Sequence, residues 1–458
     1  MQTNEAGDAT ARYAASAGLT VCLITVGLYS VWIGSRFGFD APPSSTGDEL
    51  SYDSVAWELS HGRGFSVNYA DPDFRQPYDL AAATSPDLYS IPDTTSGPIA
   101  FRPPLFPVVF SMANRITGRH FYLIRAFNVL CMAATAGLIG WFVYRESGVW
   151  PLAVVVLLFW ADTRSRLYAR TVLTEPLACF LCAVMTLLVI RLSRESGLKR
   201  RTVAALSVVT ALSILTRSVV IVWLPGLLVM LWCLIRRQHQ QSCRQALSHC
   251  GLFLLLTVLC VSPWAIRNIR LLGKFAPMGT QGQMEMSAGY SDIAWEHGGV
   301  WQNLASRNYF AAVVHDDMTT IDAELATAEK STADAVAWIR ANPAKLPALA
   351  VMKVASELRP ASFVEWLVAA LALIGVWLGR DRKLVAVLVV LIVVNLSAVA
   401  ATWSVEGRFL VPQLFVFYAL AGIGFECFVL KGRAAFDRTT ADVAAEQQGT
   451  PRRVADDS

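Results

Sequence analysis

Long apolar runs alternate with short polar segments along most of the chain. Ten runs are predicted as transmembrane helices, because an apolar helix of about 20 residues spans the hydrocarbon core. Their ranges are 17–35, 121–144, 149–161, 172–190, 202–216, 218–235, 251–266, 362–379, 384–402 and 409–430. The third and fifth are short, so we expect either a tilted hairpin or ends that lie further out. The pattern predicts an all-α polytopic membrane protein.

The composition agrees with this prediction. Hydrophobic residues make up 54% of the chain and charged residues 16%, whereas soluble proteins carry about 25% charged residues. The net charge of +4 is spread over the ends of the runs, which argues against a nucleic-acid-binding patch. The nine cysteines lie mostly in apolar runs and form neither a disulfide framework nor a zinc pattern. The uncharged run 17–35 lacks the short core of a secretory signal, and we expect it to be retained.

The distribution of Arg and Lys predicts the orientation. Basic clusters fall in the connections 191–201, 236–248 and 380–383. The positive-inside trend places these connections, and both termini, in the cytoplasm. Residues 36–120 and 268–358, here called the first and second long loops, are then expected on the outer face of the cytoplasmic membrane.

Within this frame the chain divides into three parts. Residues 1–16 and 431–458 are polar and are expected to be disordered on the cytoplasmic side, and 17–430 form the transmembrane domain. In the first long loop, 48–59 and 102–115 are predicted as interfacial helices, and 66–100 as irregular. In the second, 318–339 is predicted as a soluble helix.

Two adjacent carboxylates, Asp48 and Glu49, follow the first helix on the predicted outer side. A carboxylate in a partly dehydrated pocket can serve as a general base. The alternative is that both acids only stabilise the N-terminus of the helix that they open.

Arginines recur at the predicted outer ends of the helices. Arg102 precedes two prolines, and an arginine there could bind a phosphate or mark an ordinary loop-to-helix junction. The loop 162–170 violates the positive-inside trend, and an ionisable Glu175 follows it inside a run. These residues suggest a bound anion, although the arginines could also snorkel to headgroups. The six arginines of this predicted basic rim are Arg102, Arg164, Arg166, Arg170, Arg267 and Arg408.

Five stretches carry a resemblance to a known family. They are Asp48-x3-Tyr52-x3-Ala56-x2-Leu59-x2-Gly62-Arg63-Gly64-Phe65, Arg102-x-Pro104-Leu105-x-Pro107, Leu173-Thr174-Glu175-Pro176-Leu177, Pro263-Trp264-x2-Arg267-Asn268 and Glu406-x-Arg408-Phe409-x2-Pro412. In their order and position, from about residue 17 to 430, the chain resembles the GT-C glycosyltransferases. The similar branch is that of protein O-mannosyltransferases and bacterial aminoarabinose transferases.

The resemblance implies a function and a set of site residues. It implies transfer of one sugar from a polyprenyl-phosphate donor to a protein, lipid or polysaccharide acceptor outside the membrane, with inversion. Asp48 matches the essential acid of the family and would be the general base, while the arginines stabilise the departing phosphate. The other residues expected to bind substrate are Glu49, Tyr52, Arg102, Arg164, Arg166, Arg170, Glu175, Arg267, Asn268, Glu406 and Arg408.

Two departures and two alternatives accompany this hypothesis. Family members often have Tyr where Phe409 stands, and the soluble C-terminal domain of oligosaccharide-transferring relatives is missing, which favours a single-sugar transferase. The chemistry requires no cofactor; a divalent metal is possible but is not indicated. The alternatives are a lipid-linked glycan transporter or flippase, which would need more polar residues within the spans, and a non-catalytic subunit of an envelope complex.

Overall fold

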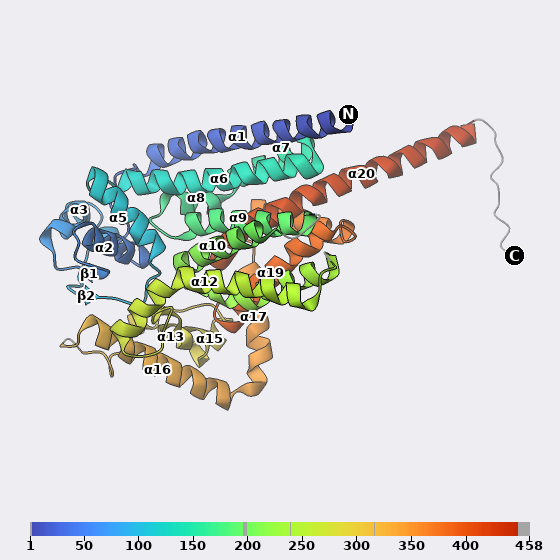
Figure 1. The fold of residues 1–458 in the computed structure, drawn as a ribbon. Coiled ribbons are helices and arrows are strands. Elements are labelled where there is room, and N and C mark those ends of the chain that lie inside the picture. The colour runs from blue at the N-terminus through green and yellow to red at the C-terminus, as the bar shows by residue number, and fades with distance from the viewer. Residues whose placement is uncertain (1, 196–198, 239, 316, 448–458) are drawn as a thin grey trace.

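The computed structural model describes residues 2–195, 199–238, 240–315 and 317–447 (Figure 1). It is a bundle of helices with two attached lobes formed by the long loops. The only strands in these ranges are two three-residue segments, β1 (Ser66–Asn68) and β2 (Ser96–Pro98). The predicted all-α architecture is confirmed.

Seven helices in the described ranges are long and apolar enough to cross a membrane. They lie within α1 (Gln2–Arg36), α6 (Phe121–Ser147), α9 (Glu175–Arg194), η1 with α11 and the first residues of η2 (Ser218–Arg236), α12 (Cys243–Leu272), α19 (Lys383–Ala401) and η5 with the first part of α20 (Arg408–Leu430). The segments of the fourth run are η1 (Ser218–Trp223), α11 (Leu224–Cys233) and η2 (Leu234–Gln238); those of the last are η5 (Arg408–Gln413) and α20 (Leu414–Gln447).

Three of the ten predicted spans are shorter helices. They are α7 (Val149–Ala161), α10 (Arg200–Thr216) and α18 (Phe363–Leu378), with 13, 17 and 16 residues. At 1.5 Å per residue they reach about 20, 26 and 24 Å, less than the roughly 30 Å of a hydrocarbon core. α18 joins α17 (Leu346–Leu358) through a 113° bend, and this pair is the eighth candidate span. Ten segments are therefore helical as predicted, but only seven or eight qualify as spans.

The first long loop folds into a lobe rather than an irregular segment. It contains α2 (Asp48–Ser60), α3 (Pro72–Ala82), α4 (Pro86–Tyr89) and α5 (Leu105–Thr117), and its two strands pair antiparallel with Val67 opposite Gly97. The interfacial helices were predicted near α2 and α5, but α3 and the strand pair correct the prediction for 66–100. Asp71 caps α3 and Pro72 begins it, which is a favourable start that a count of loop-forming residues overlooks.

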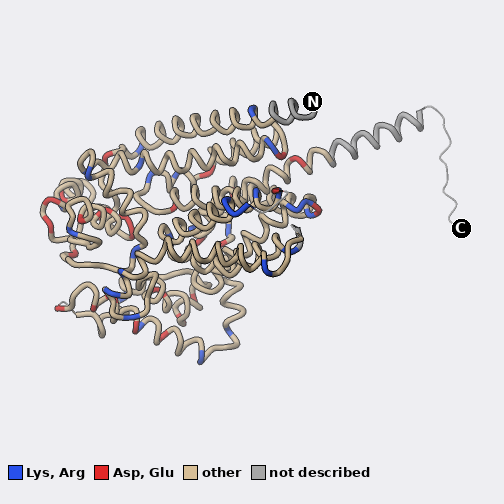
Figure 2. Tube along the Cα trace, in the orientation of Figure 1, with Lys and Arg blue, Asp and Glu red and all other residues tan. Residues whose placement is uncertain are grey.

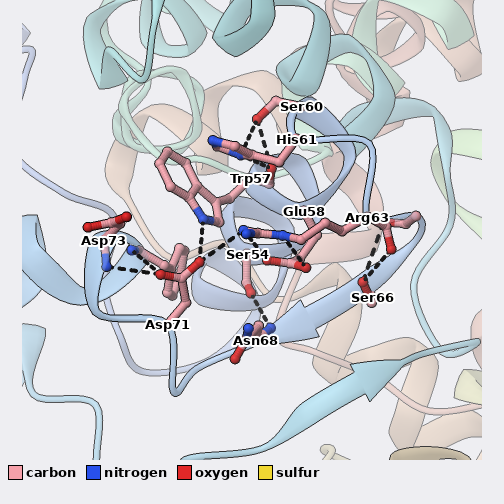
Figure 3. Close-up of polar contacts among 12 residues, drawn as sticks. Ser54, Trp57, Glu58, Ser60, His61, Arg63, Ser66, Asn68, Asp71 and Asp73 are labelled. Carbon is pink, nitrogen blue, oxygen red and sulfur yellow. Dashed lines mark hydrogen bonds and ion pairs between the residues drawn. The ribbon is translucent and has the colours of Figure 1, made fainter.

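Polar contacts hold this lobe together at the turn after α2. Arg63 donates to Glu58 at 2.7 Å and to Asp71 at 2.9 Å, and the Trp57 indole also donates to Asp71 (Figure 3). Gly62 and Gly64, with φ of +74° and +89°, provide the left-handed backbone on either side of Arg63. The Gly-Arg-Gly-Phe motif therefore has a structural role.

The second long loop forms the other lobe. Its elements are α13 (Gln281–Met284), α14 (Met286–Gly289), α15 (Asp292–Glu296), η3 (Ala305–Arg307), α16 (Thr320–Ala341), η4 (Pro343–Lys345) and α17. α16 confirms that a helix lies where one was predicted at 318–339, and Thr319 caps it by accepting from the Asp322 amide. A further short helix, α8 (Thr163–Arg170), joins α7 to α9.

The ends of the chain lie away from the first lobe. The start of α1 and the far end of α20 are both at the opposite end of the bundle from α2–α5 (Figure 1). Basic residues gather at that end, where α9 finishes with Arg191 and Arg194, whereas acidic residues are frequent in the α2–α4 lobe (Figure 2). Residues 2–16 and 431–447, expected to be disordered, continue α1 and α20, because both segments are rich in good helix formers. Residues 1 and 448–458 lie outside the described residues.

Candidate active site

A cavity of about 520 Å³ lies where both lobes meet the helix bundle. Its wall includes the start of α2, the segment before α5, η1, the 278–286 segment of the second long loop, and the residues around the start of η5. The charged residues in its described lining are Asp48, Arg102, Arg217, Glu285 and Arg408.

Asp48 lies between two guanidinium groups. Its Oδ1 is 2.7 Å from Nη2 of Arg102, and its Oδ2 is 2.8 Å from Nη2 of Arg408. Burial opposes ionisation, but the two guanidinium groups outweigh it and hold the pKa of Asp48 well below its usual range. Gly47, which precedes it with φ of +90°, occupies the cap position without a side-chain hydrogen bond, and Asp48 is the first residue of α2.

Arg102 is positioned by contacts on three sides. Its Nε donates to the Ser51 hydroxyl at 2.8 Å, and its guanidinium lies 5.2 Å from the ring centroid of Tyr52 and 4.6 Å from that of Phe101. Pro103 and Pro104 fix the backbone between this residue and α5. Arg102 is therefore a buried, preorganised cation, and Tyr52 forms part of the same wall.

Arg408 connects Asp48 to a second acidic residue. Its Nε donates to Oε1 of Glu175, which is fully buried at the first position of α9. The same oxygen accepts from Nη1 of Arg217 at 2.6 Å. The ionic network thus runs Arg102–Asp48–Arg408–Glu175–Arg217, with three cations and two anions drawn from five separate segments. Its formal charge of +1 suits an anionic ligand.

Arg217 is the member of this network that the sequence analysis missed. It stands between two apolar runs, at the end of α10 and before η1. The argument applied to Glu175, that an ionisable residue within apolar sequence is costly unless it has a function or a partner, applies equally to Arg217. The predicted boundary between two spans concealed that signal.

Two buried residues of α17 position the segment that carries Arg408. Glu357 accepts hydrogen bonds from the Ser404 hydroxyl and from the amides of Val405 and Phe409. Lys353 donates to the Thr402 carbonyl at 2.6 Å. Polar side chains at full burial are satisfied here by backbone groups, which fixes the backbone on both sides of Arg408.

The remaining predicted site residues are outside the described lining of the cavity. Glu49 accepts from the Val172 amide at 3.0 Å, and burial raises its pKa. Arg164 pairs with Glu365 at 3.0 Å and packs against Gly407, next to Arg408. Glu406 is exposed on the turn that precedes Arg408.

Arg166, Arg170, Arg267 and Asn268 make structural contacts. Arg166 donates to the Trp160 carbonyl, and the Arg170 guanidinium is 3.8 Å from the Phe37 ring centroid. Arg267 donates to the Ile99 and Phe65 carbonyls, which attaches the first lobe to α12, and Asn268 donates to the Pro277 carbonyl. The predicted basic rim therefore divides into two arginines at the cavity and four that hold neighbouring segments. The functional roles assigned to these residues stay predictions.

Comparison with known proteins identifies the family. The sequence pattern of the dolichyl-phosphate-mannose-protein mannosyltransferase family matches residues 42–271, just over half of the chain. No curated protein matches the chain in a sequence search. Two solved structures of ArnT from Cupriavidus metallidurans are similar at 14% identity. The undecaprenyl-phosphate-bound form has a TM-score of 0.39 and the match covers 95% of this chain and 80% of that one. For the apo form the TM-score is 0.37 and the coverage 90% and 78%.

The family match includes Asp48, Arg102, Glu175 and Arg217, four of the five residues of the ionic network. It confirms the resemblance to protein O-mannosyltransferases that the motifs indicated. The chain belongs to the dolichyl-phosphate-mannose-protein mannosyltransferase family and is a multi-pass membrane glycosyltransferase.

Proposed function

We propose that the protein transfers one sugar from a polyprenyl-phosphate donor to an acceptor on the outer face of the cytoplasmic membrane, with inversion at the anomeric carbon. The observation that carries this proposal is the position of Asp48 between Arg102 and Arg408 at the wall of the cavity. A carboxylate beside two phosphate-binding groups is what such a displacement needs: a base for the incoming hydroxyl and cations for the leaving group.

The donor phosphate binds at the arginines. Arg102 and Arg408 each present a guanidinium at the cavity, and Arg217 presents a third. Guanidinium groups bind phosphate through paired, charge-assisted hydrogen bonds. As the bond from the anomeric carbon to the phosphate oxygen breaks, the negative charge that develops on the phosphate is stabilised by cations already in position. For this reason we propose that no bound metal is required.

Asp48 is a weak base until the donor binds. In the free protein both of its oxygens are held by guanidinium groups, and its pKa is low. A phosphate that takes Arg102 and Arg408 as partners withdraws those groups and raises the pKa of the carboxyl. Asp48 can then accept the proton of the acceptor hydroxyl as its oxygen attacks the anomeric carbon from the face opposite the phosphate. Donor therefore binds before acceptor in this mechanism.

The test offers the purified protein a panel of polyprenyl-phosphate sugars in detergent or nanodiscs, with octyl mannoside or water as the acceptor, and donor consumption is followed by mass spectrometry. One donor should be consumed with release of polyprenyl phosphate, and the product should have the inverted anomeric configuration. Turnover of none of these donors, together with movement of a lipid-linked glycan across liposomes, would contradict the proposal and favour a transporter.

A further inference from the structure

The cavity is lined by two chemically different sets of residues. One set holds the three arginines of the ionic network. The other comes from the second long loop and contains Met284, Met286, Tyr290 and Trp301. Glu285 is the one charged residue in the described part of that second set. A phosphate is attracted to the first set and repelled by Glu285, so the two sets suit different parts of the reactants.

Glu285 is held in place with one oxygen available. It lies between α13 and α14, and the Trp301 indole donates to its Oε2 at 2.5 Å. Among the described residues no hydrogen-bond donor reaches Oε1. Trp301 is itself anchored, because its amide donates to the Ser404 carbonyl at 2.8 Å. Ser404 belongs to the segment that Glu357 fixes before Arg408.

The charge environment relates Glu285 to the ionic network. Burial raises its pKa, while the Trp301 hydrogen bond and the positive charge of Arg102 act in the opposite direction. Asp48 adds a smaller repulsion. Glu285, Asp48 and Arg102 also line the same cavity of about 520 Å³, so one ligand in that cavity can contact both sets of residues.

We propose that Glu285 and Trp301 form a subsite for a sugar ring beside the arginines. The free Oε1 accepts a hydrogen bond from a ring hydroxyl, and the aromatic face covers the apolar C–H face of the ring. The ligand class is a neutral polyhydroxylated ring, since the set offers one carboxylate, the amide side chains of Gln281 and Gln283, aromatic rings and thioethers, and no cation. This inference rests on the proposed function for the identity of the neighbouring phosphate.

The ring could be the sugar of the donor or a sugar at the acceptor hydroxyl, and an experiment can separate the two. Dissociation constants are measured for polyprenyl phosphate and for polyprenyl-phosphate mannose, glucose and aminoarabinose. The proteins are the wild type, Glu285→Ala, Glu285→Gln and the control Glu296→Gln. Glu296 lies on α15 in the same loop, is exposed, and is outside the cavity lining.

If the ring is the donor sugar, the wild type binds one sugar-bearing lipid more tightly than polyprenyl phosphate. Glu285→Ala should reduce the ratio of these two affinities, which is the donor advantage, roughly tenfold or more, as expected for a hydrogen bond to a charged group. Glu285→Gln should retain part of it, and affinity for polyprenyl phosphate itself should fall in none of the three variants, because the Glu285 charge repels the phosphate.

If the ring belongs to the acceptor, Glu285→Ala keeps the donor advantage and still hydrolyses donor with water, but its KM for octyl mannoside as acceptor rises about tenfold or more. Unchanged donor affinity and unchanged acceptor KM, or an equal loss of affinity for all lipids, would overturn the subsite. A wild type that binds no lipid contradicts the proposed function instead; the subsite then stands only if methyl mannoside binds to the wild type and not to Glu285→Ala.

Discussion

The buried pair of Glu175 and Arg217 provides a quantitative prediction about the ionic network. Glu175 has no exposed side-chain surface and Arg217 retains 10%, and their closest atoms are 2.6 Å apart. Glu175→Gln leaves Arg217 without an anionic partner, and it removes one of the two carboxylates that pair with Arg408. Removing one member of a buried pair costs about 3–5 kcal/mol, because the other charge stays buried and uncompensated. We expect the free energy of unfolding to fall by about 3 kcal/mol in Glu175→Gln and by a similar amount in Arg217→Met.

The double variant Glu175→Gln/Arg217→Met separates this effect from general damage to the site. When both charges are removed, no buried group is left unpaired. The free energy of unfolding of the double variant should therefore fall by about 2 kcal/mol less than the sum of the losses in the two single variants. Unfolding in mixed micelles titrated with SDS gives the free energies. The control is Asp79→Asn, which breaks a more exposed pair with Arg75 and should cost less than about 1 kcal/mol. Additive losses, or single variants no worse than the control, would refute the reasoning.

Three other predictions follow from individual contacts. Burial raises the pKa of Glu324 to about 7, above its ordinary 4.5, while Thr280 and the Ala100 amide oppose the shift, so the folded state holds the proton more tightly. This stabilisation, about 3 kcal/mol, is complete below about pH 4.5 and is lost as the pH rises through about 7. The unfolding midpoint should therefore fall less steeply with pH over this window in Glu324→Gln than in the wild type. Gly407→Ala places a Cβ against the Arg164 guanidinium at φ +89°, and should weaken polyprenyl phosphate binding about fivefold or more. The control Gly62→Ala, at φ +74° with open space around it, should leave this affinity unchanged. Equal affinities of the two variants for polyprenyl phosphate would contradict the role of Gly407. EDTA treatment should leave the transfer rate unchanged, whereas a loss of activity restored by Mg²⁺ or Mn²⁺ would contradict the metal-independent mechanism.

The helices could be predicted because apolar runs and their ends are local properties of the sequence. The limits of the short helices α7, α10 and α18 depend on Asp162, Arg217 and the bend before Ser362. Hydropathy averages over such single residues. The lobe of residues 66–100 was missed because its order comes from distant partners: the buried Asp53 carboxylate accepts from Tyr78 and Arg119.

The candidate site shows the same distinction between local and long-range information. Asp48, Arg102, Glu175 and Arg408 could be selected because charge at a helix end, prolines and motif order are visible in the chain. Which arginines meet Asp48 could not be predicted, since Arg408 is 360 positions away while Arg166 and Arg170 turn to the aromatic residues Trp32 and Phe37. Glu285 gave no local signal, because its importance depends on the cavity that the second long loop closes.

The central claim is that Asp48 acts in the chemical step while the arginines bind the donor. The most direct measurement compares the wild type with Asp48→Asn in single-turnover transfer and in polyprenyl phosphate binding. The account predicts that transfer falls by about 10²–10⁴-fold, the usual contribution of a general base. Binding should be unchanged or tighter, because Arg102 and Arg408 lose a competing carboxylate. Near-normal transfer by Asp48→Asn, with the variant folded and donor bound, would contradict the account.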